Sequence, residues 1–358
     1  MDQSEFATSA NAAPAKEDRS VNGRPPASAP SEITPTSAPR QCSNPAGAAS
    51  KPVASRLSRL LARRRSYAQY IRDKPDWLLV LIFGRLLIVR RLIAWASRRP
   101  PAEIESQIDH RNVVDGPPVT ELVETVNRSG IATGLRLDDP TRDAIVQFAI
   151  DAPCFQSSDR TSALASDQWE ALNERRQSDI LAAHYFETVE DCQAITAVVA
   201  DPLLRAVATR HFGRAPVHVR TRLWWSFPAR RVDDRDRYRA AQDAFHFDLN
   251  DWSTLKFFFY LTDCDRHSGA HMCIPGSHRR RRLSHQISLF MAKQTDELVR
   301  FYGPEAILTI EGSAGAGFVE DPFIFHTGTV SRDRPRLILE IEFGRRQLSC
   351  NYKFGAIG

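Results

Sequence analysis

One short stretch constrains this 358-residue chain more than any other: Ala244 to Trp252, which reads Ala-Phe-His-Phe-Asp-Leu-Asn-Asp-Trp. If it is a β-strand, His246 and Asp248 project from the same face, because side chains two positions apart share a face. An imidazole and a carboxylate held in this way are two of the three ligands of a facial triad, which binds non-haem Fe(II) and leaves coordination positions open. A second stretch, Phe323 to Gly328, carries His326 after an apolar run, and this histidine is our candidate for the third ligand.

The residues that follow these positions are typical of β-strands. Leu255 to Thr262 is dense in aromatic residues, as strands are. Phe323 to His326 and Arg336 to Phe343 are expected to pair as a hairpin, with a turn between them. Arg336 opens the second of these strands, ten positions after His326. A fixed guanidinium one strand from the metal could grip a carboxylate through two parallel hydrogen bonds.

Taken together, these motifs resemble those of the phytanoyl-CoA dioxygenase family of iron- and 2-oxoglutarate-dependent oxygenases. The resemblance runs from about residue 203 to residue 343 and rests on segments that occur in order: His246-Phe-Asp248, Lys256-Phe-Phe-Phe-Tyr-Leu-Thr-Asp263, Gly269-Ala-His271, Pro275-Gly-Ser-His278, His326 and Arg334-Pro-Arg336. Two positions depart from the family pattern. Family members commonly carry Gly-Pro where this chain has Gly269-Ala270, and the turn after His326 reads Gly-Thr-Val-Ser instead of containing Asn-X-Ser.

The resemblance implies an α+β fold with a double-stranded β-helix core (a jelly roll, cupin-like) and flanking helices. It implies Fe(II) bound by His246, Asp248 and His326, with 2-oxoglutarate as the cosubstrate, O2 as the oxidant and ascorbate in a supporting role. It also implies that Arg336 binds the distal carboxylate of 2-oxoglutarate. In this family, oxidative decarboxylation of the cosubstrate gives succinate and CO2, and a C–H bond of the substrate is hydroxylated.

Further residues are candidates for cosubstrate binding. Arg334 competes with Arg336, because a shift of two residues keeps the same strand face. Lys256 shares the parity of Phe258 and Tyr260. An unpaired ammonium on an inward face would be costly to bury, so Lys256 is expected to meet a carboxylate, either from the cosubstrate or from an Asp. Thr329, in the turn after His326, is also a candidate.

Other side chains are assigned to the substrate or to the walls of the site. Alternate positions on the predicted strand 217–227 could line the substrate mouth, namely Arg222, Trp224 and Ser226. Apolar residues expected to exclude water from the reaction are Phe245, Phe247, Phe258 and Phe325. The remaining histidines considered are not expected to be metal ligands: His218, His267, His271, His278 and His285.

The chain divides into four parts by composition. Residues 1–55 are rich in Ala, Ser and Pro without apolar periodicity, which predicts a disordered tail. Residues 56–100 form a basic helical segment, and residues 101–130, with Pro101, Pro117 and Pro118, form a polar connector. The oxygenase domain is expected over residues 131–350. Six scattered cysteines without a Cys-X-X-Cys pair indicate reduced thiols, and the first residues carry no secretory signal, so a cytoplasmic protein that is not secreted is expected.

The positive charge lies outside the predicted domain. Residues 56–99 carry twelve basic and two acidic side chains, against a net charge of +5 for the whole chain. The apolar run after Trp77 is interrupted by Arg85, Arg90 and Arg91, which argues against a membrane span. The segment is predicted to be helical, breaking at Pro75, and either packs on the domain with a solvated basic side or contacts an anionic membrane peripherally. No nucleic acid is expected as a partner, because no module that binds it is visible.

The predicted function is therefore an Fe(II)- and 2-oxoglutarate-dependent dioxygenase that hydroxylates a small-molecule or lipid-like substrate. Halogenation is disfavoured, because Asp248 occupies the position where a halogenase needs a small residue and a vacant metal site; desaturation and epimerisation remain alternatives. The non-enzymatic alternative is a cupin-like binding or scaffold protein with a vestigial metal site. The sequence does not specify the substrate.

Overall fold

The computed structural model describes Arg72 and residues 75–96, 112–156, 159–175, 179–186, 188–232, 244–288 and 291–346. The chain separates into two units, Met1–Val53 and Ala54–Gly358, and all described residues belong to the second. The predicted tail 1–55 lies outside the described residues, as do residues 56–71 of the basic segment.

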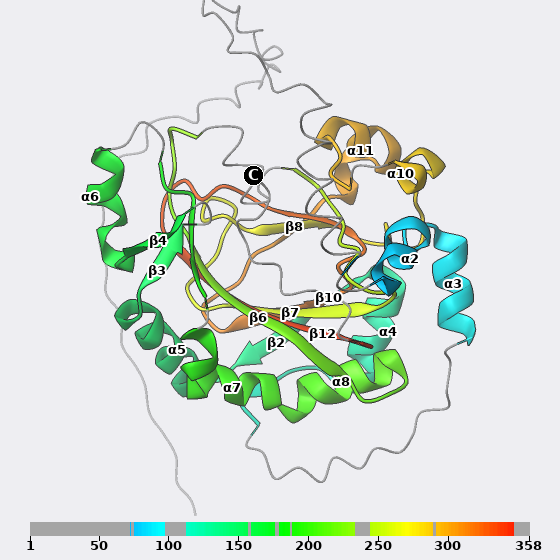
Figure 1. The fold of residues 1–358 in the computed structure, drawn as a ribbon, viewed down its shortest axis with the longest axis horizontal. Helices are drawn as coiled ribbons and strands as arrows, with labels where there is room; N and C mark the ends of the chain where they lie inside the picture. Colours follow the sequence, from blue (N-terminus) through cyan, green and yellow to red (C-terminus); the bar gives the residue numbers. More distant parts are fainter. Residues whose placement is uncertain are drawn as a thin grey trace, which may run out of the picture. The chain divides into compact units, whose positions relative to one another are not determined.

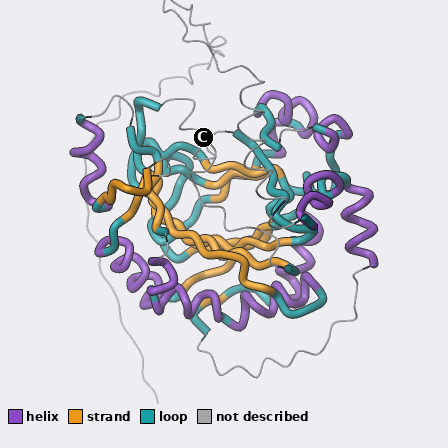
Figure 2. The backbone as a smooth tube through the Cα atoms, viewed as in Figure 1, coloured by secondary structure: helices purple, strands orange, loops and turns teal. Residues whose placement is uncertain are grey.

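The larger of two sheets has nine strands, each antiparallel to its neighbours (Figures 1 and 2). In spatial order the strands are β1 (Val114–Asp115), β2 (Ile131–Leu137), β10 (Ala316–Glu320), β7 (Thr254–Tyr260), β12 (Arg336–Gly344), β6 (Val217–Ser226), β5 (Ala182–Tyr185), β3 (Cys154–Gln156) and β4 (Asp159–Leu164). The central strand β12 is buried along its whole length.

The smaller sheet has the order β11 (Phe325–Gly328), β8 (His271–Ile274) and β9 (Leu308–Ile310), and a backbone bridge between His246 and His326 extends it by one more segment. Apolar side chains from both sheets share one core cluster, which includes Tyr260, Cys273 and Ile310. The Tyr260 hydroxyl donates to the Ile310 carbonyl at 2.9 Å and accepts from the His271 amide at 3.0 Å, so it ties the sheets together. The predicted jelly-roll core is confirmed.

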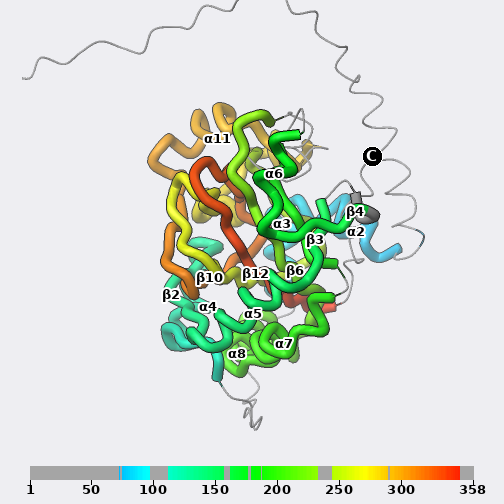
Figure 3. The backbone as a smooth tube through the Cα atoms, turned by 90° about the vertical axis from the view of Figure 1, so that its left-hand side faces the viewer, coloured from blue at the N-terminus to red at the C-terminus, as the bar shows by residue number. Residues whose placement is uncertain are grey.

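The two faces of the large sheet carry different side chains, because successive residues of a strand point to opposite sides. The outer face is apolar and packs against α4 (Val119–Ser129), α5 (Asp139–Asp151), α7 (Gln193–Ala200) and α8 (Pro202–Phe212), which lie together along it (Figures 1 and 3). Residues of this face include Leu223, Phe257, Leu339 and Ile341. The inner face carries aromatic and charged residues and is the one that bears the site.

Two segments differ from the expectation. Within the predicted connector 101–130, Val119–Ser129 is the helix α4, whose residues Leu122, Val123 and Val126 are buried in the main core. The two prolines before it end the preceding segment, but they do not prevent a helix from starting after them. Residues 323–343 also do not form a hairpin: β11 belongs to the small sheet and β12 to the large one, so the segment between them connects the two sheets.

The basic segment contributes two short helices, α2 (Asp76–Phe83) and α3 (Leu87–Ala96), separated at Gly84. The buried face of α2 packs beneath the predicted ligand stretch: Trp77 and Val80 share a core cluster with Phe247, and the Trp77 indole donates to the Leu249 carbonyl at 3.1 Å. Within the described residues, none of the helices combines the length and the apolar character needed to cross a bilayer.

The remaining described elements are short. They are the helices α6 (Trp169–Glu174), α10 (Leu283–Ile287) and α11 (Thr295–Tyr302), and the 3-10 turns at Ser166–Gln168, Thr188–Asp191 and Pro304–Ala306.

Asp201 provides a test of how the helices are attached to the sheet. Its fully buried carboxylate caps α8 by accepting from the amides of Leu203 and Leu204, and it also accepts from the amides of Val113 and Val114 beside β1. Asp201→Ala would remove the cap and leave buried amides unpaired, which is expected to lower the free energy of unfolding by about 2–4 kcal/mol in urea titrations. Asp138→Ala, which removes a cap with one bond to the Thr141 amide, is the control and should cost about 1 kcal/mol. Equal losses would contradict this role.

Candidate metal and cosubstrate site

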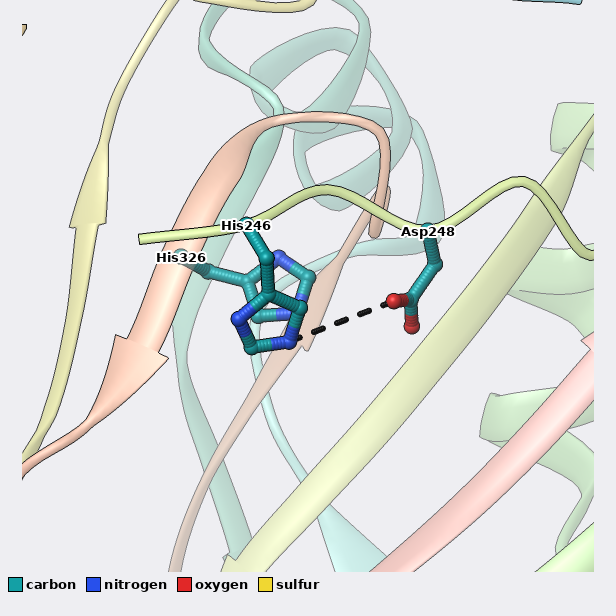
Figure 4. Close-up of side chains that lie close together, drawn as sticks. All are labelled: His246, Asp248 and His326. Carbon is teal, nitrogen blue, oxygen red and sulfur yellow. Dashed lines mark ion pairs between the residues drawn. The ribbon is translucent and has the colours of Figure 1, made fainter. Parts of the chain in front are cut away.

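Backbone pairing brings the three predicted ligands together. The amides and carbonyls of His246 and His326 exchange two hydrogen bonds of 2.9 Å, and the Asp248 amide donates to the Pro322 carbonyl at 2.8 Å. One potential ligand atom from each of His246, Asp248 and His326 lies within 4.8 Å of the other two. Figure 4 shows the Asp248 carboxylate facing the His246 ring, with Nε2 of His246 and Oδ1 of Asp248 4.0 Å apart. Among the described residues, no other such group of His, Cys, Asp or Glu is found.

Both histidines are oriented by their outer nitrogens. Nδ1 of His246 lies 3.1 Å from the Ala244 carbonyl, and Nδ1 of His326 lies 3.1 Å from the Ile324 carbonyl. Each carbonyl accepts from a protonated Nδ1, so the neutral ring presents an unprotonated Nε2 that is suited to a metal. Burial lowers the pKa of His326 to about 4, so its imidazole is neutral at pH 7. Two imidazoles and one carboxylate are a donor set that fits non-haem Fe(II).

The Asp248 carboxylate is kept ionised by Lys256. Burial opposes ionisation, but the Lys256 ammonium, 2.6 Å from Oδ2 of Asp248, holds the pKa of this carboxyl far below its usual range. Lys256 is also 3.8 Å from the Glu340 carboxylate. Lys256 was expected to meet a carboxylate either of the cosubstrate or of an Asp, and in the structure it contacts Asp248. A contact of Lys256 with the cosubstrate stays a prediction.

A row of charged side chains continues from Lys256 across the inner face. Strand register places Glu342 opposite both Lys256 and Arg220, and Glu340 opposite Arg222. Arg220 pairs with Glu342 at 2.7 Å, and Arg222 pairs with Glu340 at 3.2 Å. Burial tends to raise the pKa of Glu340, but the neighbouring Arg222 outweighs this effect, and the pKa is lowered to about 2. Charges of both signs therefore alternate over three neighbouring strands, and each has an opposite partner.

Glu320, at the end of β10, is a site residue that the sequence analysis missed. Its Oε1 is 3.3 Å from Nδ1 of His326, and its Oε2 is 2.7 Å from Nε2 of His271. The His271 ring is stacked on the His326 ring, with centroids 5.6 Å apart. Glu320 thus contacts the outer nitrogen of a metal ligand and a second buried histidine. From the sequence, Glu320 could have been placed on the same strand face as Phe318, two residues earlier. That position does not identify the histidines that Glu320 contacts.

Arg336 is buried and has donors directed into the core. It donates to the Gly269 carbonyl and, at 2.9 Å, to the Ser226 hydroxyl, whereas its Nε has no hydrogen-bond partner. Within the described part of the chain Arg336 forms no ion pair, so a bound carboxylate would supply its counter-charge. Gly269 has a φ of +86°, and a Cβ there would come 3.1 Å from the Thr329 carbonyl, so this approach requires glycine. The competitor Arg334 is exposed and pairs with Asp265 at 2.6 Å.

The other predicted residues occupy different places. The Thr329 hydroxyl donates to the Ala270 carbonyl at 2.9 Å, so its role in cosubstrate binding stays a prediction. Ser226 accepts a hydrogen bond from Arg336, and its role in substrate binding stays a prediction. The Arg222 guanidinium lies over the Trp224 ring, 4.6 Å from its centroid, and this pair remains a candidate for substrate contact.

Three of the four expected wall residues do not line the inner face. Phe247 and Phe325 pack with Phe323 in a cluster on the opposite side of the ligand stretch, because residues next to an inward-facing ligand point outward. Phe245 belongs to the same cluster. The apolar inner face is formed by Phe258 stacked on Phe318, with Ile338 and Tyr260 beside them.

Glu320→Gln tests whether this carboxylate supports the metal. Loss of an outer partner of a metal-bound histidine typically weakens metal affinity by about 10- to 100-fold, and the same loss is expected for Fe(II), or for Co(II) as an air-stable probe, measured by calorimetric titration. Glu311→Gln, an exposed carboxylate paired with Arg266, is the matched control and should leave the affinity unchanged. Unaltered metal affinity in Glu320→Gln would show that the contact is only structural.

Solved structures similar to the chain include the epimerase SnoN in complex with Fe3+, alpha ketoglutarate and nogalamycin RO (13% identity, 63% of this chain and 82% of that chain, TM-score 0.43), AviO1 from Streptomyces viridochromogenes Tue57 (17%, 63% and 95%, 0.42) and EctD from S. alaskensis with bound Fe (17%, 69% and 82%, 0.43). No curated protein matches the chain.

The family assignment comes from the sequence profile. The model of the phytanoyl-CoA dioxygenase (PhyH) family matches residues 149–333, which is more than half of the chain. This range contains the three candidate metal ligands, Lys256 and Glu320. The predicted resemblance is confirmed: the protein belongs to the phytanoyl-CoA dioxygenase family and is an iron- and 2-oxoglutarate-dependent dioxygenase.

Proposed function

We propose that the protein hydroxylates an unactivated C–H bond of a small-molecule or lipid-like substrate, with release of succinate and CO2. The observation that carries this proposal is the coexistence of two features in one core. One potential ligand atom from each of His246, Asp248 and His326 lies close to the other two, and within the described residues the buried Arg336 has no carboxylate as its counter-ion. A vestigial site would have no need to keep Asp248 ionised by burying Lys256 beside it, which has a large desolvation cost.

The residues of the chain have distinct tasks in this reaction. Bound Fe(II) supplies the redox chemistry. His246, Asp248 and His326 would hold the metal, and a set of three protein ligands would leave positions for the 2-oxo acid and for O2. Arg336 binds the far carboxylate of the cosubstrate, which fixes its orientation before the reaction. Phe258, Phe318 and Ile338 make the inner face apolar and exclude water.

Asp248 favours hydroxylation over halogenation, because its carboxylate occupies the coordination position that a halide would need. Desaturation and epimerisation use the same ligand set and are distinguished only by product analysis. The class of substrate is proposed from the mixed character of the inner face beyond the metal. There the Trp224 ring is stacked against His184 with centroids 6.2 Å apart, and Arg220 and Arg222 are already paired with Glu340 and Glu342. This favours a largely uncharged substrate.

Arg336→Ala and Arg334→Ala are a matched pair, because both remove a guanidinium and lie two residues apart. Arg336→Ala should raise the dissociation constant for 2-oxoglutarate by at least about 100-fold, since a bidentate charged contact of about 3 kcal/mol is lost from a buried site. Arg334→Ala should leave it unchanged, because that side chain is exposed. Binding is measured by calorimetry under anaerobic conditions with Fe(II). The reverse pattern would assign the cosubstrate to Arg334.

Asp248→Ala tests the enzyme against the binding-protein alternative. With Fe(II), 2-oxoglutarate, ascorbate and O2, the wild type is expected to form succinate, and the variant should lose at least about 99% of this turnover because the metal site loses its charged ligand. The anaerobic charge-transfer band that requires metal and cosubstrate at one centre should disappear in parallel. Asp143→Ala, at an exposed position on α5, should retain both signals. A wild type with neither turnover nor band would support the scaffold reading instead.

A further inference from the structure

An exposed apolar patch covers one region of the structure. Of the ten exposed large hydrophobic side chains among the described residues, eight lie on the helices α2, α3 and α10. We call these eight the apolar patch: Leu79, Ile82, Phe83, Ile88, Leu92, Trp95, Leu283 and Ile287. Trp95 is 72% exposed and Leu283 is 67% exposed. Large exposed apolar side chains that are gathered in this way usually mark an interaction site.

The three helices form one continuous surface, although α10 is almost 200 residues away in sequence. The Arg85 guanidinium donates to the Ser288 carbonyl at 2.5 Å, and the Leu87 amide donates to the Gln286 side chain at 2.9 Å. The Arg91 guanidinium donates to the Arg279 carbonyl at 2.8 Å. Figure 1 shows α2 and α3 next to α10 at one side of the sheets.

The helix α3 exposes several of its large apolar side chains. None of its ten residues is fully buried, and it contacts the domain through Leu87, which packs partly against the cluster around Phe247, and through arginines. The Arg90 guanidinium lies 3.9 Å from the centroid of the Phe323 ring, while Ile88, Leu92 and Trp95 face outward. A helix on a water-exposed surface normally turns its apolar side inward. The outward side of α3 is therefore suited to an apolar environment that the folded domain does not provide.

The border of the apolar patch is strongly basic. Arg91 on α3 and the turn before α10, with Arg279, Arg280 and Arg282, place four exposed guanidinium groups beside it. Within residues 75–96 and 276–288, which carry the patch and this border, the sole acidic residue is Asp76. Exposed apolar side chains with a tryptophan among them, bordered by cations, are the combination that binds an anionic lipid surface.

We propose that the apolar patch and its arginine border seat the protein peripherally on an anionic lipid bilayer. At about 1.5 Å per residue, the eight- and ten-residue helices reach about 12–15 Å, roughly half of a hydrocarbon core, so they lie in the interface and do not span it. A second copy of the chain is a poorer occupant, because a twofold contact through this face would bring the arginine borders of both copies together. The proposal is independent of the reaction that the site catalyses.

The test is co-sedimentation of the full chain with vesicles of phosphatidylcholine alone or with about 30% phosphatidylserine. Wild type is expected to bind the anionic vesicles and to lose binding at high salt. The variant Leu92→Glu/Trp95→Glu should bind at least about tenfold more weakly, because two side chains no longer enter the interface. Arg279→Glu/Arg282→Glu should remove the preference for phosphatidylserine. The control, Ile150→Glu, changes a large hydrophobic that is 50% exposed on α5, outside the patch, and should bind as wild type does.

Each variant is first checked for the wild-type unfolding midpoint, so that loss of binding reports on the surface. Binding that falls equally in Ile150→Glu, or a wild type that binds neither vesicle, would overturn the proposal. Light scattering covers the alternative occupant: a wild-type dimer that Leu92→Glu/Trp95→Glu converts to a monomer, without vesicle binding, would assign the face to a second copy of the chain.

Discussion

The contact between Lys256 and Asp248 is the interaction on which the rest of the site depends. A carboxylate enclosed in a protein core tends to become protonated, and a protonated Asp248 would be a poor metal ligand. The ammonium 2.6 Å away prevents this, but it would itself be costly to bury alone. Glu340 and Glu342, with Arg220 and Arg222 as their own partners, provide the surrounding charges. A metal ligand is thus kept ionised by charges on three adjacent strands.

Such an arrangement is possible because successive residues of the central strands point alternately to the apolar, helix-covered face and to the charged inner face of the sheet. On β12, Leu339 and Ile341 point to the helices, while Glu340 and Glu342 point to the site. The helices on the outer face exclude water from one side of the sheet, and the ion pairs are confined to the other. A shift of register by one residue would exchange these environments and bury the charges among the helices. The charged row therefore also specifies how β6, β7 and β12 align.

Sequence reasoning succeeded where the signal was local. The aromatic strand that became β7 follows from a period of two. The stretch 244–252 forms isolated bridges and not the expected strand, although His246 and Asp248 do lie close together. Sequence reasoning failed where the answer depends on which sheet a strand joins. Residues 323–343 have the pattern of a hairpin, yet β11 and β12 lie in different sheets. Glu320 was missed for the same reason, because its contacts with His271 and His326 come from segments on other strands. The choice between Arg334 and Arg336 likewise required knowing which side chain is buried.

The indole of Trp77 has a consequence for how the protein can be shortened. This side chain lies outside the matched family region, yet it donates to the Leu249 carbonyl, one residue beyond Asp248, and packs with Phe247 behind the ligand stretch. The stretch 244–252 is joined to its neighbours by isolated bridges instead of a full ladder, so it has little lateral support of its own. A chain trimmed to residues 149–333 would keep the three candidate ligands but lose the Trp77 contact, together with Arg336 and the central strand β12. The packing that supports the candidate iron site therefore extends to Trp77, outside the family region.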